Sequence, residues 1–91
     1  WLGEELKWGI SFVVECVFRD RRGLLMEVTE ILYNTGLSIK GMKAEEIWDG
    51  KVHDTFILET SDDDYYIFER LETRLKFDIA ELESIKLISM H

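Results

Sequence analysis

The hydrophobic pattern changes its period at residues 18–25, and this change limits the fold more than any other feature of the sequence. Apolar residues alternate with others over residues 10–18, which is typical of a strand with one buried face. Over residues 24–34 they recur every three or four positions, which is typical of an amphipathic helix. Residues 18–25, Phe-Arg-Asp-Arg-Arg-Gly-Leu-Leu, are therefore predicted to turn the chain from a strand into a helix.

The first helix and second strand are bounded by glycine signals. Gly36 is placed to end the helix in the left-handed conformation that glycine adopts without strain. A second strand is predicted over residues 37–48, irregular near Gly41. The pair Asp49-Gly50 that follows is one of the strongest short signals for a hairpin turn, because both residues tolerate positive φ.

The second half of the chain repeats the alternation of strand and helix. A third strand is predicted over residues 52–60. Residues 61–64, Ser-Asp-Asp-Asp, are predicted to start and cap a second helix. The apolar stripe of this helix is Ile67, Phe68, Leu71 and Leu75. A fourth strand is predicted over residues 82–90.

The predicted order of elements is β-α-β-β-α-β, which gives an α+β fold. Two helices and four strands of these lengths bury their apolar sides most simply as a ferredoxin-like sandwich, a four-stranded antiparallel sheet with both helices on one face. The 91 residues allow one such domain, which we place at residues 10–91 after an N-terminal arm at residues 1–9. Because the chain opens on Trp1, we expect it to be a piece of a longer protein.

Charge and cysteine content narrow the classes of partner. The formal net charge is −8, which disfavours nucleic acid or an anionic membrane surface as the main partner. No apolar run approaches the roughly 20 residues that span a bilayer. The one cysteine, Cys16, leaves no internal disulfide and fits a reducing compartment, so a cytoplasmic location is expected.

The first turn and the two segments after it resemble a known family. They are similar to the ACT domain, a small-molecule-binding regulatory module. The segments that carry this resemblance are residues 18–25, Val28-Thr29-Glu30-Ile31-Leu32 and Gly36-Leu37-Ser38-Ile39. Within that family the chain is most similar to the C-terminal domain of RelA/SpoT-type guanosine tetraphosphate synthetase/hydrolases, the enzymes of the stringent response. ACT repeats of uridylyltransferases and plant ACT-like proteins share the turn, and residues 49–56 look more like the former.

The resemblance implies a regulatory domain of an enzyme and no catalytic residues of its own. It implies a homodimer through the edge of the second strand, links to the catalytic domains of a parent protein, and no cofactor. An amino-acid ligand would lie between the first turn of one chain and the second strand of its partner. The predicted ligand-binding residues are Asp20, Arg21, Arg22, Gly23, Leu24, Ser38 and Ile39.

Each of the turn residues also has a purely structural interpretation. Asp20 is predicted first to cap the helix and only second to contact a ligand. Gly23 is there either for positive φ or to leave room for a ligand. Arg21 and Arg22 suit a carboxylate or phosphate, although adjacent arginines on a turn are more often just solvated.

Other functions have weaker support in the sequence. An RNA-recognition domain has the same order of elements but stacks bases on aromatic residues of the open sheet face, where this chain has Val13, Glu15, Val17, His53, Thr55 and Ile57. Docking of the parent on a ribosome through shape alone stays open. An acylphosphatase-like site would need a positioning asparagine near the turn, and Asn34 is far along the helix. No metal site is predicted, because Asp54 points away from His53 in a strand and His91 is remote.

Overall fold

Among the residues that the structure describes, four strands and two helices follow one another in the order that the sequence predicts. The computed structural model describes residues 9–61 and 64–90. The predicted arm at residues 1–9 lies outside them except for Gly9, as does His91. The elements are β1 (Ile10–Arg19), α2 (Leu24–Asn34), β2 (Ser38–Ile47), β3 (Lys51–Thr60), α3 (Ile67–Asp78) and β4 (Leu82–Met90).

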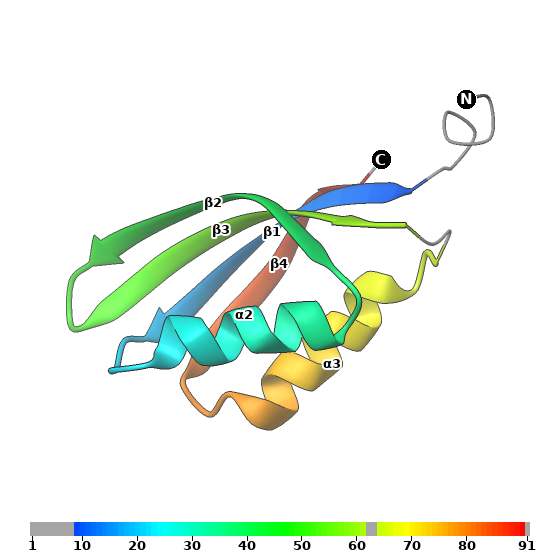
Figure 1. Cartoon of the computed structure of the whole chain (residues 1–91). Helices are drawn as coiled ribbons and strands as arrows, with labels where there is room; N and C mark the ends of the chain where they lie inside the picture. Colours follow the sequence, from blue (N-terminus) through cyan, green and yellow to red (C-terminus); the bar gives the residue numbers. More distant parts are fainter. Residues whose placement is uncertain (1–8, 62–63, 91) are drawn as a thin grey trace.

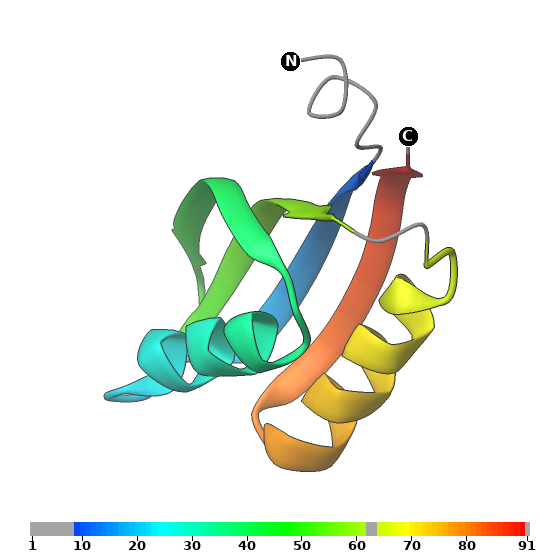
Figure 2. The same cartoon turned by 45° about the vertical axis from the view of Figure 1, so that its right-hand side comes forward.

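The strands form one antiparallel sheet, and both helices cover the same face of it. The strand order is β2-β3-β1-β4, so β2 and β4 are the two edges. Figure 1 shows α2 and α3 side by side below the sheet. In Figure 2, α2 lies under the β2 side, with which it is in contact, and α3 lies under β4. The predicted ferredoxin-like sandwich is therefore confirmed.

The core lies between the sheet and the two helices, and it is made by the apolar residues that the sequence pattern assigns to the buried faces of these elements. Every second residue of β1 is buried, in agreement with the predicted buried face. The apolar stripe of each helix packs on this face, which buries its residues. The largest fully buried side chains are Phe12, Phe18 and Phe56, together with Leu32, Leu58, Leu71 and Leu75. Truncating a buried phenylalanine to alanine costs about 3–5 kcal/mol, so these rings fix how the helices sit on the sheet.

The predicted turn signals are confirmed by backbone angles. Gly36 follows α2 with φ 89°, and the hairpin residues Asp49 and Gly50 have φ 64° and 68°. Positive φ at both central residues is the type I′ geometry that matches the twist of a hairpin. The irregularity expected near Gly41 is a shift of register between Ile39 and Gly41 in the pairing of β2 with β3.

The start of the second helix differs from the prediction. α3 begins at Ile67, not within residues 61–64, and no side chain of the described residues caps its first turn; residues 62 and 63 of the predicted start lie outside the described residues. The backbone N–H of Tyr66 donates instead to Asp64 Oδ1 over 2.9 Å, and Arg70 pairs with the same carboxylate. Asp64 therefore orders the turn before the helix, since the N–H group that it accepts from belongs to Tyr66, which precedes α3.

Within the described part of the chain, the second half of β2 has no helix covering it and no strand pairing with its outer side. Met42 faces the helix side of the sheet, where it is paired with the buried Phe56, yet it is 46% exposed. Ile47 and Trp48 at the end of the strand are 41% and 82% exposed. An edge strand with apolar residues in the open offers a surface for another strand. No helix among residues 9–61 and 64–90 is long and apolar enough to span a membrane.

Candidate functional site

The turn between β1 and α2 is held by its backbone, not by a side-chain cap. The N–H of Arg19 donates to Glu81 O over 2.9 Å, and the N–H of Asp20 donates to Gly50 O over 2.8 Å. Gly23 is the N-cap residue, with φ 78°, and no side chain of the described residues caps the backbone N–H groups at the start of α2. The prediction that Asp20 caps this helix is wrong, because the left-handed backbone at Gly23 already starts the helix. The first N–H groups of α2 are left without a capping side chain.

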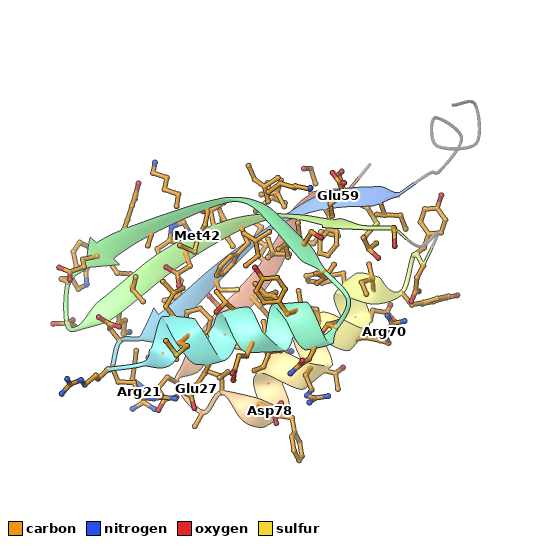
Figure 3. The ribbon with its side chains drawn as sticks, viewed as in Figure 1. Arg21, Glu27, Met42, Glu59, Arg70 and Asp78 are labelled. Carbon is orange, nitrogen blue, oxygen red and sulfur yellow. The ribbon has the colours of Figure 1, made fainter. Side chains whose placement is uncertain are left out.

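The two arginines of the turn have different surroundings. Arg21 forms ion pairs with Glu27 and, over 2.9 Å, with Glu81, and both hydrogen bonds raise its pKa. Figure 3 shows Arg21 and Glu27 together at the start of α2. Arg22 is exposed, and its side chain forms no ion pair with any residue that the structure describes. Arg22 is therefore the guanidinium of the turn that is free to meet an anion.

A cleft of about 230 Å³ lies between the β1–α2 turn, the start of α2, the second half of β2 and the first half of β3. The β2–β3 hairpin turn lies at the same end of the molecule (Figure 1). Four apolar side chains, from Leu24, Leu25, Ala44 and Val52, and three carboxylates, from Asp20, Glu46 and Asp54, line it. No lysine, arginine or histidine is among the lining residues. The cleft therefore combines an apolar wall with strong negative charge.

Asp54 is a buried acid in the wall of this cleft. It lies on the core face of β3, opposite Cys16 of β1 and Ala44 of β2, and is only 3% exposed. Its Oδ1 atom has no hydrogen-bond partner among the residues that the structure describes. Burial, and then the nearby charge of Asp20, raise its pKa above the usual value of 3.8, while His53 acts weakly in the other direction. Burial and the Asp54 charge raise the pKa of the Cys16 thiol to about 12, in agreement with its predicted role as a small buried residue.

The structure brings together some of the predicted ligand residues and separates others. Asp20 and Leu24 line the cleft, and Arg22 and Gly23 lie between these two residues in the turn without lining it. Ser38 and Ile39 begin β2, next to Glu59 and Leu58 of β3. Glu46 of the cleft lies seven residues further along, about 20 Å at the rise of a strand. Ser38 and Ile39 of the same chain therefore cannot reach this cleft.

The open face of the sheet has the composition that the sequence predicts. His53 lies there, with its Nε2 3.7 Å from a carboxylate oxygen of Glu15, whereas Asp54 faces the core. Ser38, Lys43 and Glu45 of β2 extend this face opposite Glu59, Thr55 and His53. Among the described residues no three acidic, histidine or cysteine side chains are placed to hold a metal ion.

A second hollow, of about 430 Å³, lies along the outer side of α3 between Tyr66 and Phe77. Both rings are largely exposed, and Arg70 and Arg74 lie between them. It is larger than the cleft at the turn but more open to solvent. It contains no residue that the sequence singled out.

Comparison with solved structures identifies the fold. The ACT domain from the GTP pyrophosphokinase of Chlorobium tepidum matches with a TM-score of 0.72 and 11% identity, over 89% of this chain and 100% of that one. The small subunit of acetolactate synthase from Thermotoga maritima matches with a TM-score of 0.72 and 15% identity, over 87% of this chain and 47% of that one. An ACT domain protein from Streptococcus pneumoniae matches with a TM-score of 0.67 and 14% identity, over 86% and 89%. No family model and no curated protein matches the sequence.

These matches confirm the expected likeness to ACT domains, including one from a GTP pyrophosphokinase, at the level of the fold. Sequence reasoning missed five residues of the cleft, namely Leu25, Ala44, Glu46, Val52 and Asp54. For Asp54 a signal was present. It falls on the same strand face as Phe56 and Leu58, where an acid is unusual.

Proposed function

We propose that this chain is a regulatory ACT module that binds a small aliphatic amino acid and pairs with a second copy of itself. Its parent would be a cytoplasmic RelA/SpoT-type guanosine tetraphosphate synthetase/hydrolase, with residues 10–91 as the module and residues 1–9 as an arm leading to it. The fold shared with the ACT domain of a GTP pyrophosphokinase supports this parent. A uridylyltransferase-like or plant ACT-like parent is the alternative.

The observation that carries the proposal is the cleft at the β1–α2 turn. Its volume of about 230 Å³ is below the range of about 300–1,000 Å³ usual for drug-sized ligands, so it suits a molecule the size of an amino acid. The uncapped N-terminus of α2 and the free Arg22 can take a carboxylate, since both supply positive charge and N–H donors. Asp20 can take the ammonium, and Leu24 can meet an apolar side chain.

Pairing of two chains would supply the remaining predicted residues. Two copies of β2 that pair antiparallel bring the start of one strand beside the end of the other. Ser38 and Ile39 of the second copy would then lie near Glu46 and close the open side of the cleft. The exposed Met42, Ile47 and Trp48 would be covered at the same time. Arg21 would contribute through its pairs with Glu27 and Glu81, which hold the turn in shape.

The test is calorimetric titration of each of the twenty amino acids into the wild-type chain and two variants of Gly23. A side-chain carbon at Gly23 would meet no atom of its own chain within 4 Å, but the φ of +78° strains most residues. Gly23→Asn adds volume with a residue that tolerates this backbone, whereas Gly23→Val adds volume and strain.

If Gly23 leaves room for the ligand, Gly23→Asn binds at least tenfold more weakly than wild type but melts at nearly the same temperature. If the glycine serves the backbone alone, Gly23→Asn binds normally and only Gly23→Val loses stability. No heat from any of the twenty amino acids with the wild-type chain would refute the amino-acid role and leave protein docking as the better account.

A further inference from the structure

Asp54 is a carboxylate with no cation paired to it among residues 9–61 and 64–90. A charge is kept in a protein interior only where another charge or several hydrogen bonds compensate for the lost water. Asp54 is 3% exposed, its Oδ1 accepts no hydrogen bond, and it forms no ion pair with a residue that the structure describes. The described part of the chain therefore provides no partner for Oδ1 of this side chain.

The other titratable groups that line the cleft near Asp54 are acids, so they add negative charge and do not compensate the charge of Asp54. Asp20 at the turn and Glu46 on β2 are exposed acids at the rim of the same cleft. Cys16, opposite on β1, is a neutral thiol at ordinary pH because its pKa is about 12. His53 is on the other face of the sheet, beside Glu15. A cation from solution would meet acids at the rim of the cleft and a third acid in its wall.

The lining of the cleft indicates what kind of cation fits. Among residues 9–61 and 64–90, no three acidic, histidine or cysteine side chains are close enough to hold a metal ion, so the acids of the cleft do not form a metal site. The remaining wall is made by Leu24, Leu25, Ala44 and Val52, which favour an apolar group over a hydrated ion. An ammonium joined to a short aliphatic chain satisfies both parts of the wall.

We propose that Asp54 anchors the ammonium group of the ligand, so that the cleft recognises small aliphatic primary amines, with or without a carboxylate. This inference rests on the proposed function for the location of the ligand, but it moves the ammonium from Asp20 at the rim to Asp54 in the wall. It also makes the ammonium the essential group. The carboxylate of an amino acid would then add affinity at the turn without being required.

The experiment uses three probes that share one aliphatic chain. Leucine has both charged groups, 3-methylbutylamine has only the ammonium, and 4-methylpentanoate has only the carboxylate. Each is titrated by calorimetry into the wild-type chain, Asp54→Asn, and Asp49→Asn. Asp49 is an exposed acid of the hairpin turn that does not line the cleft, and asparagine tolerates its φ of 64°, so Asp49→Asn is the matched control.

The expected result is that wild type and Asp49→Asn bind leucine and 3-methylbutylamine but not 4-methylpentanoate. Asp54→Asn should lose at least tenfold in affinity for both amines and keep its native circular dichroism spectrum. Binding of calcium or magnesium that competes with the amines would overturn the organic-cation assignment.

The outcomes also separate this inference from the proposed function. If leucine binds wild type and Asp54→Asn equally well, the anchor role is wrong while the amino-acid module stands. If 3-methylbutylamine binds and none of the twenty amino acids does, the amino-acid module is wrong while the anchor role stands. Binding of 4-methylpentanoate without 3-methylbutylamine contradicts the inference directly.

Discussion

Replacing Asp54 with asparagine should make the free protein more stable. Asparagine has nearly the same shape but no charge, so it removes the cost of an unpaired buried carboxylate. An unsatisfied buried polar group costs about 1–3 kcal/mol, and a charged one more. Since the amide of the asparagine introduced at position 54 would still lack partners, we expect a gain of about 1–3 kcal/mol at pH 7. For a domain of this size each kcal/mol raises the melting temperature by about 4–8 °C.

The gain should depend on pH in a defined direction. The pKa of Asp54 is raised in the folded state by burial and by Asp20, above the value of 3.8 expected when unfolded. The folded state therefore holds this proton more tightly, and its stability falls as pH rises from about 3.8 through the raised pKa. Asp54→Asn lacks this loss, so its advantage over wild type should be small near pH 4 and largest at pH 7.

Urea unfolding of both proteins, followed by far-ultraviolet circular dichroism at several pH values, measures this difference. Other acids titrate in both proteins and cancel in the comparison. Asp49→Asn should match wild type throughout, because Asp49 is exposed. A variant less stable than wild type at pH 7, or a difference that does not change with pH, would refute the argument that the Asp54 carboxylate is unpaired in the free chain.

Three further predictions concern the sheet edge, the open face and the core. The chain should form a dimer with a dissociation constant on the order of tens of micromolar, typical of a weak small interface. In sedimentation Ile47→Glu should be monomeric, whereas Ile88→Glu, an equally exposed position on the other edge strand, should not differ from wild type. An Ile47→Glu dimer as strong as wild type would contradict pairing through β2. The chain should not bind single-stranded or duplex RNA at submicromolar concentration and physiological salt. The net charge is −8, and the central strands β1 and β3 have no aromatic residue on the open face. A fluorescence anisotropy titration that shows such binding would prove this prediction wrong. Cys16, buried and with a pKa of about 12, should not react with a thiol reagent at pH 8 until urea unfolds the chain. Rapid reaction of the native protein would contradict its burial.

The fold was predictable because the local signals agree with one another. Alternation in β1, helical spacing in α2 and the Asp49-Gly50 turn each determine a local structure, and these structures can bury their apolar sides together in few ways. The helix starts were less predictable. Acids near a start look like caps, yet at the first helix the backbone of Gly23 took that role, and at the second Asp64 ordered a turn instead.

Of the residues that line the candidate site, the sequence predicts only residues of the β1–α2 segment. Asp20 and Leu24 lie next to each other in the sequence and could be found there, whereas Glu46 and Asp54 reach the cleft from β2 and β3 through the register of the sheet. Register over ten residues is a long-range property that a hairpin signal only partly determines. The alternation of β3 did place Asp54 on the buried side. A charged residue at a core position was the available clue to the acid in the wall.

We have proposed that two chains together complete one ligand site. The most direct test is to measure the dissociation constant of the dimer with and without leucine. A ligand that contacts both chains must strengthen their association by the same factor by which association strengthens its binding. Sedimentation at several protein concentrations should therefore show a dissociation constant at least fivefold lower in saturating leucine, and no such change for Asp54→Asn. If leucine binds the wild-type chain and leaves the dissociation constant unchanged or raises it, the site is contained in one chain and the account of the partner strand is wrong.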